Sequence, residues 1–193
     1  MYYVLEQDIN HSVSASFLDA NPGHHMKWYK GQQFEKDELP SNLQLHIDND
    51  DIEITDENED GVYPDFFTGI ATAFCSEKTY QVLDKAGIQN IQYYPVVIIE
   101  EGGRHVEGYY AMNILGRIAC LDRSQSKCNY FEGEVVRIKS MVLEESLVHD
   151  IPIFRLHELP DTILVNEKVA NLIAGLVGVH LSPAEGWNDN HLF

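Results

Sequence analysis

The stretch IPIFRLHELPDTILVNEKVANLIAGLVGVHL, from Ile151 to Leu181, has the pattern of two strands, a helix and a closing strand. Its second apolar run, Ile163–Val165, lies between a Pro-Asp turn and Asn166, a residue type that favours helix N-caps. Gly175 or Gly178 is expected to end the helix, because glycine readily adopts the conformation that follows a helix. Between cap and glycine, apolar residues recur at helical spacing, at Val169, Leu172, Ile173 and Leu176.

An earlier stretch, AFCSEKTYQVLDKAGIQNIQYYPV from Ala73 to Val96, repeats this order of elements. Ser76 stands in the capping position, a Glu-Lys pair follows each cap, and an Ala-Gly pair ends each helix. We therefore predict two similar strand–helix–strand units. Duplication of one unit and chance recurrence of ordinary helix punctuation both stay open, because repeat arrays usually need three or more copies.

The rest of the chain is richer in strand patterns than in helix patterns. A Gly-Gly turn at 102–103 is expected to join two of the strands as a hairpin. The expected strands, read from β-branched, aromatic or alternating runs, are Tyr2–Leu5, Leu43–Ile47, Ile91–Glu100, Val106–Met112, Tyr130–Phe131 and Val135–Val142.

Three segments lack a regular pattern. His11–Lys30 is expected to be irregular, Asn113–Leu121 to be a short helix or an irregular core segment, and the tail after Pro183 to be loose. Because strands outnumber helices, we predict an α+β fold with mixed, mostly antiparallel sheets and a few helices packed on one side. Residues 1–193 are expected to form one domain, although a boundary near 101–104 would divide it into halves 1–101 and 104–193.

The net charge excludes some classes of binding partner for this protein. The 193 residues include 31 acidic and 13 basic ones, which gives a formal net charge of −18. Such a chain repels nucleic-acid phosphates and anionic membrane surfaces, so neither is expected as a direct partner. It would instead attract a basic partner at an elevated rate.

The sequence indicates a cytoplasmic protein. No segment approaches 18 uninterrupted apolar residues, and the first residues, MYYVLEQDIN, lack the basic leader and apolar core of a signal peptide. Cys75, Cys120 and Cys128 are an odd number without CxxC spacing, which suits reduced thiols. Cys75 is expected to be a small buried hydrophobic residue and not a nucleophile.

The most acidic segment runs from Asp48 to Asp60 and contains no basic residue. We call it the acidic tract. It reads either as a solvated loop or as a surface presented to a basic partner, and it is our candidate partner-binding site. Its carboxylates are Asp48, Asp50, Asp51, Glu53, Asp56, Glu57, Glu59 and Asp60.

Part of the acidic tract resembles a calcium-binding loop. Asp56, Asn58, Asp60 and Gly61 fit its opening positions, D-x-[DN]-x-[DN]-G. Phe67 stands where the bidentate glutamate is required, and a proline interrupts the loop. A calcium-responsive binding module is therefore an alternative to a purely acidic surface.

No pattern typical of an enzyme appears in the chain. There is no GxSxG, no Gly-rich phosphate loop and no CxxC pair. His157-Glu158 begins like HExxH, but Asp161 occupies the fifth position and Pro160 would break the required helix. His149-Asp150 is a sequence neighbour pair, which is weak evidence for acid–base chemistry. No catalytic residue, metal ligand or cofactor is assigned, and an enzyme with an unrecognised site stays an alternative.

Four stretches carry a likeness to a known family: YYVL at Tyr2–Leu5, PDFFTGIATAFCSEK at Pro64–Lys78, YYAMNILGRIACLD at Tyr109–Asp122 and IPIFRLHELPDTILVNEKV at Ile151–Val169. They resemble the immunity proteins of bacterial polymorphic toxin systems. More narrowly, they are similar to the eleventh named immunity family, first catalogued as a domain of unknown function. The acidic tract and the tail that contains Gly, Asn and His depart from the family pattern.

The resemblance implies an inhibitor and not an enzyme. Such a protein binds a cognate toxin made by its own cell or delivered by kin, often by a contact-dependent or type VI secretion route. A cytoplasmic inhibitor implies a toxin that acts in the cytoplasm. Nucleic-acid-cutting toxins have basic clefts, and an acidic protein can fill such a cleft as a phosphate mimic. We therefore predict that the acidic tract occludes the active site of a nuclease.

The calcium alternative and the acidic-surface reading predict different responses to calcium. A calcium site would raise the melting temperature in millimolar calcium, and Asp60→Ala would abolish that rise. The acidic-surface reading predicts no rise in either protein beyond the general effect of salt. Thermal unfolding of both proteins, with magnesium as the control cation, distinguishes the two.

Overall fold

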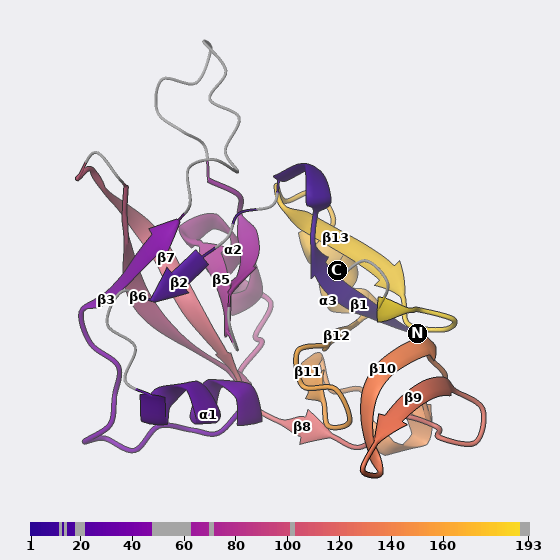
Figure 1. Ribbon diagram of the computed structural model, residues 1–193. Helices are drawn as coiled ribbons and strands as arrows, with labels where there is room; N and C mark the ends of the chain where they lie inside the picture. Colours follow the sequence, from indigo (N-terminus) through magenta and orange to yellow (C-terminus); the bar gives the residue numbers. More distant parts are fainter. Residues whose placement is uncertain are drawn as a thin grey trace.

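The computed structural model describes residues 1–11, 13, 15–17, 22–47, 63–69, 72–100 and 103–189, of which 22–25 are described by their backbone alone. The strands of this part form a closed barrel, a five-stranded sheet and a two-stranded ribbon. The barrel and the sheet stand side by side, and the ribbon lies on the sheet side (Figure 1). Mixed sheets with three helices among the described residues confirm the predicted α+β fold.

The barrel closes in the strand order β2-β3-β6-β7-β5-β4. The β2–β4 and β3–β6 pairs are parallel, and the other described neighbours are antiparallel. Phe67 and Phe74 stack inside it with ring centroids 5.2 Å apart. Its strands are β2 (Ala15–Phe17), β3 (Leu43–Ile47), β4 (Phe66–Gly69), β5 (Thr72–Ser76), β6 (Ile91–Ile99) and β7 (His105–Ile114).

The five-stranded sheet has the order β13-β1-β12-β11-β8. Its strands are β1 (Tyr2–Gln7), β8 (Arg117–Ile118), β11 (Ile153–Leu156), β12 (Ile163–Asn166) and β13 (Val179–Pro183). Successive residues of β1 and β12 point to opposite faces. Leu5 and Val165 join a core shared with the barrel, whereas Val4 and Leu164 join a core shared with the ribbon. The sheet is therefore the middle layer of the molecule.

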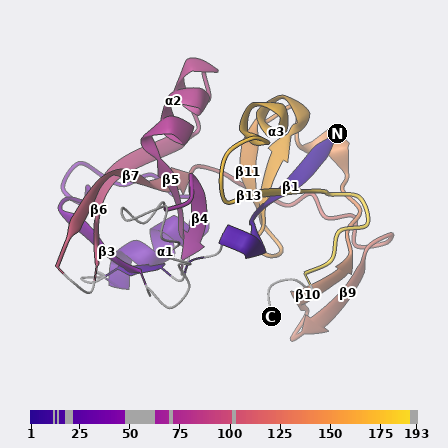
Figure 2. The same cartoon turned by 90° about the horizontal axis from the view of Figure 1, so that it is seen from above.

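Both predicted strand–helix–strand segments have the same topology. β5 and β6 flank β7, and β12 and β13 flank β1, so each helix connects two strands separated by one antiparallel strand. The helices α2 (Glu77–Lys85) and α3 (Glu167–Ile173) contact each other over the shared core. Figure 2 shows both on the same side of the molecule. Descent of the two segments from one duplicated unit stays a prediction.

The predicted caps hold both helices. The Ser76 hydroxyl accepts a hydrogen bond from the Thr79 N–H at 3.3 Å, and the Asn166 side chain accepts one from the Val169 N–H at 3.0 Å. Each bond satisfies a backbone donor that the first helical turn leaves open. The predicted hairpin of β6 and β7 is also present, so strands on the two sides of residues 101–104 pair with each other.

The expectation that His11–Lys30 is irregular is wrong. β2 lies there, and α1 (Pro22–Lys30) begins at a proline, which the first helical position accepts without losing a hydrogen bond. Trp28 anchors this helix in the barrel core, with its ring against those of Phe34 and Tyr94 at 4.9 and 5.4 Å. Trp28 is the one buried side chain among those described in α1, and a single buried residue gives the sequence no apolar period.

The segments 113–121 and 184–189 also differ from expectation. Residues 113–114 end β7 and β8 follows, with no helix. After Pro183, Ala184, Trp187 and Asp189 are buried against the ribbon strand β10 (Glu134–Ser140). Asp189 accepts hydrogen bonds from the Ile138 N–H at 2.9 Å and the Arg137 Nε at 3.1 Å. The polar composition of the tail concealed these contacts, because each of them is with residues far away in the chain.

Asp65 joins the barrel to both helices. Its carboxylate accepts hydrogen bonds from the Ser76 hydroxyl at 2.7 Å, the Lys78 Nζ at 2.9 Å and the Val177 N–H at 3.0 Å. Its backbone N–H donates to the Val177 carbonyl at 2.8 Å. Burial raises the pKa of this carboxyl, but the hydrogen bonds from Ser76, Lys78 and Val177 outweigh burial and leave the pKa below its ordinary value.

Gly178 allows this junction to close. It has a φ of +82°, and a Cβ at this position would lie 2.4 Å from the Phe66 carbonyl oxygen and 2.5 Å from the Pro64 Cβ. A side chain would therefore push the α3–β13 turn away from the segment that carries Asp65.

We expect Asp65→Asn to destabilise the protein by about 1–3 kcal/mol at pH 7, because three donors, among them the hydroxyl of the buried Ser76, lose a charged acceptor. Since the folded-state pKa is lowered, the contribution of this carboxylate is complete above its unfolded pKa of about 4. It is lost as the pH falls through the folded pKa, so the difference between the variant and the wild type should shrink in acid. Urea unfolding at several pH values measures it.

The control for this prediction is Asp84→Asn, which removes an exposed carboxylate from the same helix that Asp65 anchors. It should change the free energy of unfolding by less than about 0.5 kcal/mol at every pH. An Asp65→Asn effect that stays constant down to pH 2, or that equals the control, would contradict the role given to Asp65.

We predict that the barrel and the sheet unfold together, because α2 and α3 share one apolar core. The two tryptophans of the chain report on the two parts separately: Trp28 lies in the barrel core and Trp187 in the core between sheet and ribbon. Each of the variants Trp28→Phe and Trp187→Phe keeps one tryptophan. In each variant, the urea midpoint measured by the fluorescence of that tryptophan should equal the midpoint measured by circular dichroism. Separate midpoints within either variant would instead support two halves.

Candidate functional site

The eight carboxylates of the acidic tract lie outside the described residues, as does the calcium-like loop at 56–61. The described residues on either side of them, Ile47 and Tyr63, are 0% and 5% exposed and belong to the barrel core. The tract is therefore attached to the barrel at two buried points. Phe67, which stands in place of the calcium-binding glutamate, is also fully buried in that core.

Tyr63 is held by hydrogen bonds of both its side chain and its backbone. Its hydroxyl donates to the Glu100 Oε1 at 2.8 Å, and its carbonyl accepts a hydrogen bond from the Tyr109 hydroxyl at 3.1 Å. Burial, and then the hydrogen bond with Glu100, raise the pKa of Tyr63, so this phenol stays a neutral donor. The attachment point is thus packed and hydrogen-bonded at the same time.

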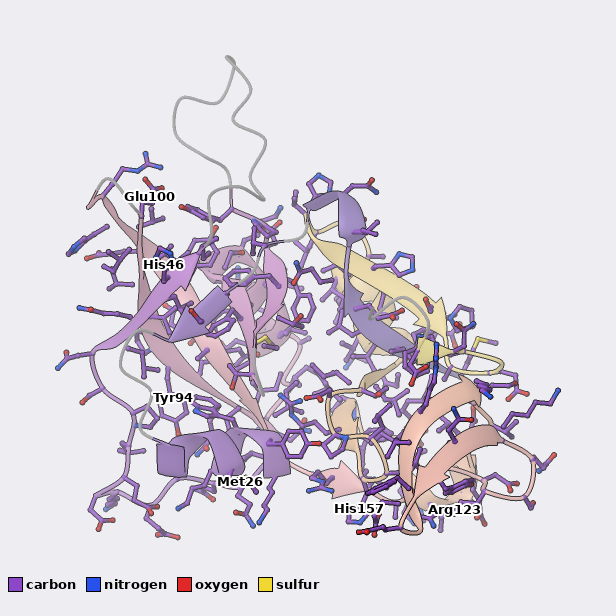
Figure 3. All side chains as sticks on the ribbon, viewed as in Figure 1. Met26, His46, Tyr94, Glu100, Arg123 and His157 are labelled. Atoms are coloured by element: carbon purple, nitrogen blue, oxygen red, sulfur yellow. The ribbon has the colours of Figure 1, made fainter. Side chains whose placement is uncertain are left out.

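Glu100 is neutralised locally. Arg104 donates to it through Nε at 2.9 Å and through a terminal nitrogen at 2.7 Å, in a bidentate pair. Glu100 and His46 lie at the same end of the barrel (Figure 3). The carboxylate of Glu100 is therefore committed to the scaffold.

A second acidic feature is a hollow of about 210 Å³ on the sheet side of the molecule. We call it the acidic hollow. Its lining includes three acidic residues, Glu145, Asp150 and Glu167, and the basic residue Lys168. Its remaining lining residues are Met1, Tyr2, Val148 and Asn166.

The acidic hollow is assembled by contacts between distant segments. The Glu167 N–H donates to the Met1 carbonyl at 3.2 Å, and the Tyr2 hydroxyl donates to the Ile151 carbonyl at 3.3 Å. Burial, and then the negative charges of Asp150 and Glu145, raise the pKa of Tyr2. These residues belong to three separate stretches, so no local sequence pattern could have revealed the hollow.

The backbone is strained at its rim. His149 and Asp150 have φ values of 43° and 58°, in the left-handed region that residues with a side chain rarely adopt. Asp and His are among the residue types that tolerate it best. The strain turns the chain sharply between a short 3-10 helix, Glu145–Leu147, and β11. His149-Asp150 is thus a turn element at a surface hollow.

The histidine–carboxylate pairs singled out from the sequence are not assembled as acid–base pairs in the described part of the chain. His157 is exposed whereas Glu158 is 9% exposed, so the two side chains lie in different environments. His11 does contact Asp8 at 3.0 Å, but on the surface. No group of three or more His, Cys, Asp or Glu side chains among the described residues is arranged to hold a metal ion.

Arg155 and Arg117 hold the turn between β11 and β12. Arg155, 2% exposed, donates to the Pro160 carbonyl at 2.9 Å, and Arg117 donates to the His157 carbonyl at 2.8 Å. The segment that joins β11 to β12 is therefore part of the scaffold. The predicted burial of Cys75 is confirmed, at 0% exposed, and burial raises the pKa of its thiol, which leaves it unreactive.

No helix in the described ranges is long and apolar enough to cross a membrane. A comparison with curated proteins gives no match. A comparison with family models matches the Immunity protein family (Imm11) over residues 11–185. This match spans both the barrel and most of the sheet, and the chain belongs to the Imm11 immunity protein family.

Proposed function

We propose that this protein binds a cognate bacterial toxin in the cytoplasm and neutralises it by covering its active site with an acidic surface. The observation that carries the proposal is the family match over residues 11–185. The net charge of −18 supports it, because a strongly acidic protein attracts a basic partner over a distance of about 8 Å at physiological salt.

A nuclease is the toxin class that this charge fits best. Its cleft must attract phosphates, so it is lined by basic groups that carboxylates can also satisfy. The acidic tract has eight carboxylates in the segment Asp48–Asp60 and no basic residue. In the acidic hollow, by contrast, Lys168 offsets part of the charge of three carboxylates. We therefore assign the main toxin contact to the acidic tract.

The attachment of the tract supports this assignment. Its two ends join Ile47 and Tyr63, which are packed in the barrel core, and Tyr63 is also hydrogen-bonded to Glu100 and Tyr109. Fixing both ends of a binding segment lowers the entropy lost when it is ordered on a partner.

The experiment is co-expression with the toxin encoded beside the gene for this protein, followed by purification of the complex. We expect the wild type to protect cells, to form a complex and to block binding of a labelled oligonucleotide by the toxin. The variant Asp56→Asn/Glu57→Gln/Glu59→Gln should slow association about tenfold at low salt, because it removes steering charge. The rate constants come from stopped-flow measurements at several salt concentrations.

The matched control is Glu145→Gln/Asp150→Asn/Glu167→Gln, which changes the net charge equally but in the acidic hollow. Its association rate should stay within about threefold of the wild type, since its charges lie away from the contact. Equal effects of the two variants would show that only net charge matters, and a larger effect of the control would move the site to the hollow. Failure of the wild type to protect or to bind would refute the proposed function itself.

A further inference from the structure

One face of the barrel carries apolar side chains that join no core. Burial alternates along β6, where Val96 and Ile98 are buried in the barrel core. Val97 and Ile99 therefore point outward, and both are half-buried. Neither belongs to any of the three cores of the described residues, and Pro95 on the same side is exposed. A strand with one face in water normally carries polar residues on that face, so this stripe needs an explanation.

The two neighbouring strands place polar side chains around the stripe. The register sets Gln44 of β3 beside Val97, and it sets His46 of β3 and His105 of β7 on either side of Ile99. Gln44 and His105 are exposed, and His46 is half-buried. An apolar centre with a polar rim is typical of a protein–protein interface. We call these five residues and Pro95 the outer barrel face.

A β-bulge lies beside the same stripe. Where β7 passes Val97, the register shifts, so that Glu107 and Gly108 both lie opposite this one residue. Gly108 has a φ of +86°, which glycine adopts without strain. Bulges redirect side chains and are frequent at the rims of barrels and next to functional sites. Here the bulge places Glu107, which is exposed, opposite the stripe.

The helices lie on other parts of the barrel. α2 packs on β5 and β7 and meets the first part of β6, where the rings of Tyr80 and Tyr93 are 4.9 Å apart. α1 enters the barrel core through Trp28. Figures 1 and 2 show β3 and β6 on the side of the barrel that faces away from the five-stranded sheet. The outer barrel face is therefore accessible to a partner.

The charge of this region fits a basic partner. β3, β6 and β7 contain no lysine and no arginine. Arg104, in the turn between β6 and β7, is paired with Glu100. A basic partner therefore meets no fixed positive charge on these strands.

The outer barrel face also adjoins both residues that flank the acidic tract. His46 directly precedes Ile47. Glu100 directly follows Ile99 and accepts the hydrogen bond of 2.8 Å from the Tyr63 hydroxyl. A partner bound at the tract would thus lie next to the stripe.

We propose that the outer barrel face is the apolar part of the toxin interface and receives lysine and arginine side chains from the edge of the basic cleft. Their aliphatic stems can lie on Val97 and Ile99 while their charged ends point toward Glu107. This proposal rests on the proposed function, because its partner is the toxin. A second copy of this chain is a poor occupant, since two copies with a net charge of −18 repel each other.

The test measures the Kd of the purified toxin for variants of the outer barrel face. Val97→Thr keeps the shape of the side chain but removes apolar surface, and it should raise the Kd about fivefold. Gln44→Lys should raise the Kd about fivefold or more, because it repels a basic partner. Gln44 is exposed, so this variant is expected to fold.

Matched controls make the same changes elsewhere. Val136→Thr alters an exposed valine in the ribbon of β9 (Lys127–Phe131) and β10, and Gln33→Lys alters an exposed glutamine that follows α1. Each control changes the net charge as its counterpart does. Both should leave the Kd within about twofold of the wild type.

Chemical modification of histidines gives a direct readout of contact. His105 is exposed on the outer barrel face, whereas His157 and His180 are exposed in or next to strands of the five-stranded sheet. We expect His105 to react with diethyl pyrocarbonate more slowly in the complex than in the free protein, because an interface excludes the reagent. His157 and His180 should react at an unchanged rate, as measured by peptide mass spectrometry.

The outcomes separate this proposal from the proposed function. If the wild type binds the toxin while Val97→Thr and Gln44→Lys bind equally well and His105 stays reactive, this proposal is wrong and the proposed function stands. If the two variants alter self-association and not toxin binding, the occupant is a second copy and this proposal is also wrong. If the wild type binds no toxin, both fail.

Discussion

The carboxylate of Asp65 is the point at which the separate parts of this molecule are joined. A carboxylate with little access to water is costly unless donors surround it, and here Ser76, Lys78 and Val177 provide them. Ser76 caps α2, and Val177 lies in the turn after α3. One side chain thus fixes the start of one helix relative to the end of the other. The absence of a side chain at Gly178 lets the two backbones approach closely enough for this to happen.

This junction produces a scaffold of three layers. The barrel has its own aromatic core, the sheet separates two further cores, and α2 and α3 cover the boundary between barrel and sheet. β5 shows how fully the barrel is enclosed: all five of its residues are buried, because one face packs inside the barrel and the other on the shared core. The charged groups that we assign to binding lie on segments attached to this scaffold and not inside it.

The described residues that flank the acidic tract, Ile47 and Tyr63, belong to the barrel core, whereas the two-stranded ribbon lies on the sheet side of the molecule (Figure 1). A partner held by the acidic tract would therefore meet the barrel first, because the tract is joined to that part of the scaffold.

Much of the fold could be predicted because its signals are local. Ser76 and Asn166 cap helices through bonds to residues three positions later, and the hairpin pairs β6 with β7, which are close together in the sequence. The elements that the sequence did not predict depend on contacts between residues far apart in the chain. α1 depends on Trp28 entering a core built from distant strands, and the tail depends on Asp189 meeting Arg137 and Ile138. No short-range pattern encodes such contacts.

The same division applies to function. The sequence by itself determined the net charge, the acidic tract, the absence of familiar catalytic motifs and the likeness to immunity proteins, because each of these is a property of composition or of residue order. Only the tertiary structure decided that the residues flanking the tract, Ile47 and Tyr63, are buried and that Glu145, Asp150 and Glu167 share one hollow. These features arise when strands far apart in the chain become neighbours, and β1 between β12 and β13 is the clearest case.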